Sequence, residues 1–193
     1  GNFATQDFTL NVVPKKKSTP SNSYIPFSDA LRDYKAENTE IGIDVSKWQG
    51  EIDFKKVKEA GAEFAIIRIG HQDGFNGEYI IDPYFEQNIK NAKENGLKIG
   101  VYFYSYANSN EEAKKQANWV IDNLSDYKLD LPIVYDWESW SNFNSVNASL
   151  YKFNEIAATF LEEIENNNYD SMLYSSKNYL EKIKRVYIVA CGT

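Results

Sequence analysis

The chain has 193 residues, of which 42% are hydrophobic and 15% aromatic, and it carries a formal net charge of −7. This composition excludes general disorder and fits one globular domain with a sizeable core, while the acidic balance excludes nucleic acid or an anionic membrane surface as partner. A single cysteine excludes an internal disulfide, and a single histidine leaves little for a zinc site or a Ser-His-Asp triad. We therefore expect no metal and no cofactor.

Residues 1–40 differ from the rest of the chain, because they are rich in Pro, Ser, Asn and Lys and lack sustained periodicity. This composition predicts a linker or leader segment. Within it, residues 27–38 could form one short helix with Ser28 as its N-cap. Residues 41–193 are expected to form the functional domain. No apolar run approaches the roughly 20 residues that span a bilayer.

From residue 41 onward, strands and helices alternate. Predicted strands cover residues 41–46, 63–70, 97–107, 131–138, 171–176 and 186–190, and predicted helices cover residues 53–61, 82–96, 109–125, 147–168 and 177–184. Such alternation with short turns indicates parallel βαβ units. Neither a G-x-G-x-x-G loop nor a Gly-Lys-Ser/Thr loop is present, which weakens a nucleotide-binding interpretation. We predict an α/β fold of the TIM-like (β/α) barrel type.

The stretch "LPIVYDWE" (131–138) begins as a buried strand and ends in acid. Asp136 and Glu138 are two residues apart, so they share one face of the strand with Cβ atoms roughly 6 to 7 Å apart. In (β/α) barrels the active site forms at the carboxyl ends of the strands. Other polar residues at such ends are Asp44, Arg68, Tyr104, Tyr106 and Tyr174.

Two carboxylates at a barrel mouth suit cleavage of a glycosidic bond, since one can donate a proton while the other stays ionised. Aromatic rings can lie against the apolar faces of sugars, and the candidates are Trp48, Tyr79, Tyr104, Trp137 and Trp140. A structural alternative stands beside each assignment. Arg68 would serve equally well to neutralise a buried acid, and His71 is predicted to be a surface residue in the polar loop "HQDGFNGEY".

Several motifs occur together in a characteristic order. They are "DVS" at 44–46 with "QG" at 49–50, "RIG" at 68–70, Asp82 with Phe85 and Asn88, "GVY" at 100–102, and "DWE" at 136–138. In these motifs residues 41–174 resemble the glycoside hydrolase family 25 lysozymes, which are muramidases of phage endolysins and Gram-positive autolysins.

The resemblance implies hydrolysis of the β-1,4 bond between N-acetylmuramic acid and N-acetylglucosamine in peptidoglycan. Glu138 matches the general acid, Asp136 the partner carboxylate at the anomeric centre, and Asp44 the acid that ends the first strand. Asp136 either acts as nucleophile or orients the substrate's 2-acetamido group. The residues expected to contact substrate are Arg68, Tyr104, Tyr106, Trp140 and Tyr174.

The resemblance also has a gap. Residues 41–193 provide about six predicted strands, whereas a closed barrel needs eight strands and typically 200 residues or more. The closing segments of the family, including a late Trp-Gln-Tyr stretch, have no match in "RVYIVACGT". We therefore expect a catalytic domain that lacks its last strands.

The remaining expectations concern partners and alternatives. The expected partner is the glycan of peptidoglycan, met by a monomer that is secreted to the cell wall or delivered there by a phage, although no signal peptide is visible. Two other functions stay open. The chain could be a non-catalytic wall-binding remnant, or a glycosidase acting on another amino-sugar polymer such as chitin.

Overall fold

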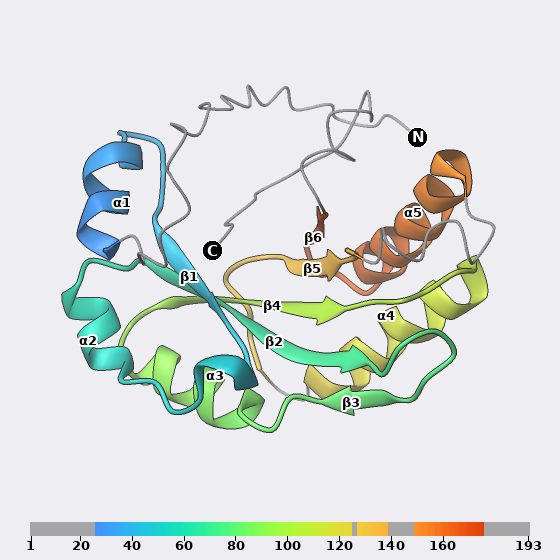
Figure 1. Cartoon of the computed structure of the whole chain (residues 1–193), viewed down its shortest axis with the longest axis horizontal. Helices are drawn as coiled ribbons and strands as arrows, with labels where there is room; N and C mark the ends of the chain where they lie inside the picture. Colours follow the sequence, from blue (N-terminus) through green and yellow to red (C-terminus); the bar gives the residue numbers. More distant parts are fainter. Residues whose placement is uncertain (1–25, 125–126, 139–148, 176–193) are drawn as a thin grey trace, which may run out of the picture.

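The computed structural model describes residues 26–124, 127–138 and 149–175. These residues form an α/β fold around one six-stranded sheet with the order β1-β2-β4-β5-β6, and β3 is attached to β2 (Figure 1). Among the described strands, β1 pairs only with β2, and β6 pairs only with β5. The predicted α/β architecture is confirmed, and over the described residues it is a barrel-like sheet that does not close.

Five strands run parallel to one another and one does not. The parallel strands are β1 (Gly42–Val45), β2 (Phe64–Gln72), β4 (Lys98–Tyr104), β5 (Ile133–Asp136) and β6 (Ser171–Tyr174), and β3 (Tyr79–Ile81) is antiparallel to β2. The sequence interpretation missed β3, because it assigned the whole stretch 71–79 to a loop. Instead, the end of β2 and the short β3 form a hairpin.

The helices follow the predicted alternation. They are α1 (Phe27–Tyr34), the 3-10 helix η1 (Lys47–Gln49), α2 (Phe54–Glu59), α3 (Phe85–Glu94), α4 (Asn110–Leu124) and α5 (Leu150–Asn166). Side chains of Asp53 and Ser149 accept backbone N–H groups at the starts of α2 and α5. The predicted cap at Ser28 is wrong, because α1 begins one residue earlier and the carbonyl of Pro26 accepts the first helical N–H groups.

The core lies between the sheet and helices α3, α4 and α5, which cover one of its faces (Figure 1). Ile67, Val101 and Ile133 are fully buried on the strand side, and Ile89 and Phe160 are fully buried on the helix side. Because side chains alternate along a strand, the residues between these buried positions point to the opposite face of the sheet. That second face carries the candidate site.

The part of residues 1–40 that the structure describes contacts the sheet at the amino ends of the strands. Lys35, just after α1, forms an ion pair of 2.5 Å with Glu63, and Glu40 forms one with Lys98. These two ion pairs join residues on both sides of the predicted domain boundary at residue 40, and that boundary stays a prediction. None of the described helices is long and apolar enough to cross a lipid bilayer.

Candidate active site

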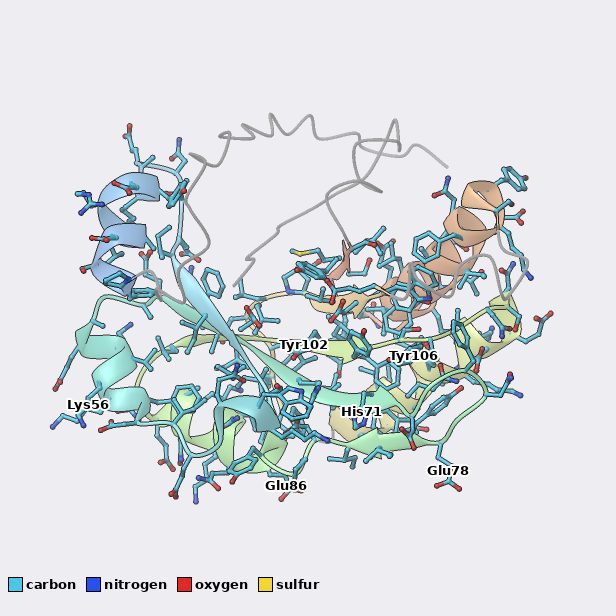
Figure 2. The ribbon with its side chains drawn as sticks, in the orientation of Figure 1. Lys56, His71, Glu78, Glu86, Tyr102 and Tyr106 are labelled. Atoms are coloured by element: carbon cyan, nitrogen blue, oxygen red, sulfur yellow. The ribbon has the colours of Figure 1, made fainter. Side chains whose placement is uncertain are left out.

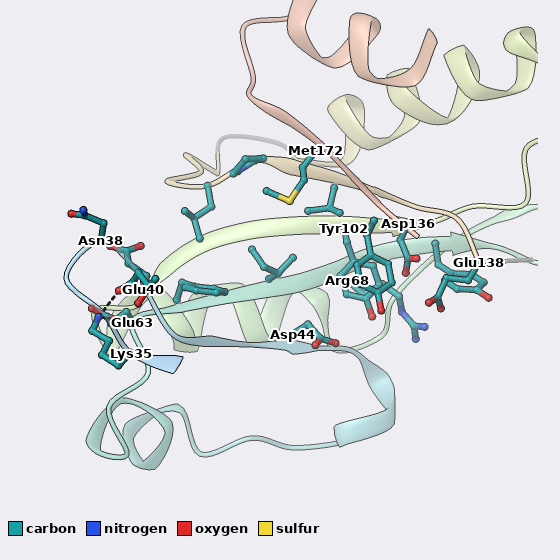
Figure 3. Close-up of a pocket in the computed structure, with 18 of the residues that line it drawn as sticks. Lys35, Asn38, Glu40, Asp44, Glu63, Arg68, Tyr102, Asp136, Glu138 and Met172 are labelled. Atoms are coloured by element: carbon teal, nitrogen blue, oxygen red, sulfur yellow. Dashed lines mark hydrogen bonds and ion pairs between the residues drawn. The ribbon is translucent and has the colours of Figure 1, made fainter. Parts of the chain in front are cut away.

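A cavity of about 940 Å³ lies on the sheet face opposite the helices and extends from the amino to the carboxyl ends of the strands (Figure 3). Its floor is apolar and includes Ile66, Val134 and Met172. Polar side chains gather at both ends. The residues at the carboxyl end are Asp44, Trp48, Arg68, Tyr102, Tyr104, Asp136, Glu138 and Tyr174.

The register of the parallel strands brings three predicted residues to one level. Tyr104 of β4 is paired with Asp136 of β5, and Asp136 is paired with Tyr174 of β6. Equivalent positions in neighbouring parallel strands direct their side chains to the same face, so these three groups line the same wall of the cavity. Asp44 lies on β1, which is at the edge of the described sheet, and its side chain lines the same cavity.

Asp136 is the most strongly perturbed acid of the site. Its residue is only 7% exposed, and among the described residues its Oδ1 atom has no hydrogen-bond partner. Burial raises the pKa of Asp136 well above the ordinary value, and the nearby charges of Glu138 and Asp44 raise it further, while Arg68 lowers it. Removing this group from water therefore favours its protonated form.

Glu138 and Asp44 lie in more open positions. Glu138 is an exposed residue just past the end of β5, and desolvation of its carboxyl group raises its pKa, with a smaller increase from Asp44. A hydrogen bond from Tyr174 acts in the opposite direction. Burial also raises the pKa of Asp44. All three carboxyl groups thus hold their protons to higher pH than isolated acids, which suits acid catalysis near neutral pH.

Arg68 is buried and paired with an acid. Its Nε donates to Oδ2 of Asp82 at 2.7 Å, and its Nη2 lies 2.6 Å from the same oxygen. Asp82 is 2% exposed and also accepts the backbone N–H groups of Lys47 and Tyr84. Arg68 therefore neutralises a buried acid, which was the alternative to a substrate contact, and it also lines the cavity.

The five aromatic candidates separate into different environments. Trp48 is 78% exposed and lines the cavity together with Tyr104. Trp137 is buried against Phe153, with ring centroids 4.6 Å apart, and its indole N–H donates to the carbonyl of Ala107. The ring of Tyr79 packs edge-on against Phe103 and Trp119 in the core. Trp140 lies outside the described residues.

Sequence reasoning missed part of the site. Tyr102 lines the large cavity, and a smaller cavity of about 350 Å³ beside it is lined by His71, Lys47 and Tyr106 among others. Figure 2 shows Tyr102, Tyr106 and His71 over the centre of the sheet, whereas Lys56, Glu78 and Glu86 project from the periphery. Tyr102 could have been found from the sequence, since it shares the two-residue spacing of Tyr104 and Tyr106.

His71 is thus not the surface residue that the sequence predicted, because it lies in β2 and is half-buried. Tyr106 follows β4 and faces the smaller cavity, with its ring edge-on to Tyr104 at 5.3 Å between centroids. A buried polar network supports this region from behind. The side-chain carbonyl of Gln72 accepts the backbone N–H of Tyr106 at 3.1 Å and the side-chain amide of Gln116 at 2.8 Å.

Within residues 26–124, 127–138 and 149–175, no group of three or more His, Cys, Asp or Glu side chains could hold a metal ion. The chemistry that this part of the site offers is that of carboxyl groups with raised pKa, beside aromatic rings and a compensated arginine. Such a set can protonate a leaving oxygen and stabilise a positive centre.

Comparison with known proteins identifies relatives over most of the chain. The family described as "Glycosyl hydrolases family 25" matches residues 43–190. The autolytic lysozyme of Clostridium acetobutylicum is 28% identical over 138 residues, which are 72% of this chain and 39% of that protein. The chain spans between 32% and 39% of the length of the curated relatives it matches.

Solved structures agree with this result. A family 25 glycosyl hydrolase from Bacillus anthracis superposes with a TM-score of 0.64 at 26% identity, over 80% of this chain and 69% of that chain. The modular autolysin LytC of Streptococcus pneumoniae, in complex with a synthetic peptidoglycan ligand, gives a TM-score of 0.64 at 25% identity, over 76% of this chain and 35% of that chain.

Proposed function

The chain belongs to glycosyl hydrolase family 25, and we propose that it hydrolyses the glycan strands of peptidoglycan at the β-1,4 bond between N-acetylmuramic acid and N-acetylglucosamine. The lysozymes among its relatives support this substrate, as does the neighbouring autolysin structure that holds a synthetic peptidoglycan ligand. The partner is then the bacterial cell wall, which the protein reaches by secretion or by phage delivery.

The observation that carries the proposal is the group of three acids at one end of the large cavity. Glu138 is the proton donor, because its carboxyl group combines a raised pKa with an exposed position from which it can reach a glycosidic oxygen. Asp136 is the partner carboxyl group beneath the anomeric centre, and Asp44 is a third acid that lines the same end of the cavity. Three acids this close together do not ionise independently, and the group that is ionised while Glu138 keeps its proton favours the positive charge that develops on the sugar in the transition state.

The proposed substrate contacts follow from the lining of the cavities. Trp48 offers an exposed ring for the apolar face of a sugar, and the hydroxyl groups of Tyr104 and Tyr174 offer hydrogen bonds. Arg68 and Tyr106 complete the contact surface. We propose residues 41–193 as the catalytic unit, acting as a monomer behind a leader of residues 1–40.

Loss of turbidity of a peptidoglycan suspension tests this function. We expect the wild-type protein to clear the suspension and release reducing sugar, and Glu138→Gln to lower the rate by about 10² to 10⁴-fold, the contribution of a positioned general acid. The matched control is Glu37→Gln, because Glu37 lines the opposite end of the same cavity. Equal clearing by wild type and Glu138→Gln would exclude Glu138 as the acid, and wall binding without sugar release would exclude hydrolysis.

A further inference from the structure

The smaller cavity adjoins the proposed catalytic centre directly. Its volume is about 350 Å³, and it shares Trp48, Arg68 and Tyr104 with the large cavity. The residues that belong to it alone include Lys47, His71 and Tyr106. A sugar bound at the acids could therefore place a substituent in this second space without leaving the first.

An irregularity in β2 turns His71 toward this cavity. Arg68 is paired with Tyr102 of β4, yet Gly70 is paired with the next residue, Phe103, so that Ile69 is an extra residue in β2. Such a bulge changes the face to which the following side chains point. Without it, Arg68 and His71 would lie on opposite faces of the strand. With it, both line the same cavity.

The cavity offers polar groups that other side chains do not already use. The ammonium group of Lys47 lies 5.2 Å from the ring centroid of Trp48, and within the described residues it forms no ion pair with a carboxylate. Nδ1 of His71 is buried, and the part of the chain that the structure describes provides no hydrogen-bond partner for it. Arg68, in contrast, is already paired with Asp82.

We propose that the smaller cavity is the subsite for the lactyl group of N-acetylmuramic acid, whose acyl oxygens accept hydrogen bonds from Lys47 and His71. The proposal rests on the function proposed above and names what selects the muramic acid unit. N-acetylglucosamine lacks this group, so the contact would distinguish the two sugars that alternate in the glycan. Lys47 and His71 are then specificity-determining residues.

The environment of His71 agrees with this role. Burial lowers its pKa, the charges of Arg68 and Lys47 lower it further, and Asp73 and Asp82 act in the opposite direction. The imidazole is thus neutral at pH 7 and can donate one hydrogen bond without an ion-pair partner. Asp73 also lines the cavity, so the acyl oxygens bind on the side of Lys47 and His71, away from that carboxylate.

The test measures binding by calorimetry in the Glu138→Gln background, which prevents turnover. The ligands are a tetrasaccharide of alternating N-acetylglucosamine and N-acetylmuramic acid with free lactyl carboxyl groups, the same tetrasaccharide with an alanyl amide on each lactyl group, and chitotetraose. We expect the first two to bind about tenfold more tightly than chitotetraose, the gain from one hydrogen bond to a charged group. If only the free acid binds more tightly, the subsite recognises the carboxylate. If the free acid and the alanyl amide both bind more tightly, it recognises the acyl group.

Variants assign this gain to the cavity. Lys47→Met and His71→Phe, each added to Glu138→Gln, should remove the preference for lactyl-bearing ligands and leave the affinity for chitotetraose unchanged. Lys55→Met is the matched control, because Lys55 is an exposed residue of α2 outside both cavities. Equal affinity for all three ligands would overturn the inference, as would an equal loss for all three in both variants. Wild-type clearing of cell walls would still stand in either case, so the two proposals fail separately.

Discussion

The two ends of the large cavity carry carboxylates in opposite physical states (Figure 3). At the carboxyl ends of the strands, desolvation raises the pKa of Asp136 and of Glu138. At the amino ends, hydrogen bonds from Lys35 and from the backbone of Ile41 lower the pKa of Glu63. At the amino end, hydrogen bonds stabilise the ionised carboxylate. At the carboxyl end, burial disfavours ionisation, and only such a carboxyl group with a raised pKa is suited to acid catalysis.

Replacing Asp136 should give the largest contrast between the ends. Asp136→Asn is expected to lower the rate of wall hydrolysis by about 10² to 10⁴-fold, because the partner carboxyl group is lost while the shape is kept. Turbidity assays at pH 6 to 8 measure this. Glu63→Gln, the corresponding amide replacement at the amino end, is the control and should retain the wild-type rate. Equal losses in both variants would contradict a functional division of the cavity.

The same substitution should stabilise the fold. Between the ordinary Asp pKa of 3.8 and the raised value in the folded protein, the folded state keeps a proton that the unfolded chain has released. The free energy of unfolding of the wild type therefore falls as pH rises through this window. The free energy of the Asp136→Asn variant does not fall in this way, because its amide does not ionise. We expect Asp136→Asn to be more stable than the wild type at pH 7, because burial penalises a charge that the amide does not carry.

Denaturant unfolding of wild type and Asp136→Asn at pH 7 and pH 3.5 measures this gain. The difference should become much smaller at the lower pH, where the carboxyl group is protonated in the folded state and mostly protonated in the unfolded state. A variant less stable than wild type at pH 7 would show that Asp136 is a structural acid.

A smaller effect is expected from Tyr174, whose hydrogen bond lowers the pKa of Glu138. Tyr174→Phe removes that bond and keeps the ring, so the pKa of Glu138 should rise. The basic limb of the pH profile of kcat/KM, where the acid loses its proton, should then move to higher pH. Tyr151→Phe is the control, because Tyr151 is 72% exposed and lies outside both cavities. A limb that moves to lower pH would contradict the assignment.

The smallest effect should come from the amino end. Glu63→Gln removes the ion pair with Lys35, which is solvent-accessible and therefore weak. Because the pKa of Glu63 is lowered in the folded protein, its contribution is present above the ordinary Glu value and is lost as pH falls through the folded value. We expect a slight decrease in Tm at pH 7 that 1 M salt abolishes, measured by calorimetry. A large decrease would show that the pair is structurally essential.

The sequence predicted the parts of the site that follow from strand periodicity. Asp136 and Glu138 were found because a two-residue spacing repeats on one face of a strand, and Asp44, Tyr104 and Tyr174 because parallel strands end at a common edge. Trp137 was a candidate ring for a sugar face, and it is instead buried in the core, because the same alternation directs it to the opposite face from these acids.

Other features depend on contacts that no local pattern encodes. The bulge at Ile69 turns the side chain of His71 to the opposite face of the sheet, although the sequence around it is typical of a regular strand. The short strand β3 is held by pairing with β2, so its three residues carry too little periodicity to be recognised. Close packing explains Gly70, where a Cβ atom would lie 2.5 Å from the carbonyl oxygen of Ile80 and 2.6 Å from Trp119.

Asp82 has a consequence for how the site region opens and closes. One carboxyl group accepts hydrogen bonds from Arg68 of β2, from the backbone of Lys47 in η1, and from Tyr84 before α3. If η1 detached alone, the buried carboxylate of Asp82 would lose one of its hydrogen bonds, at a cost of about 1 to 3 kcal/mol. The amide hydrogen of Lys47 should therefore exchange with solvent as slowly as those of β2, although it belongs to a single turn of helix. The short helix η1, which carries Trp48, and the sheet should therefore open as one cooperative unit.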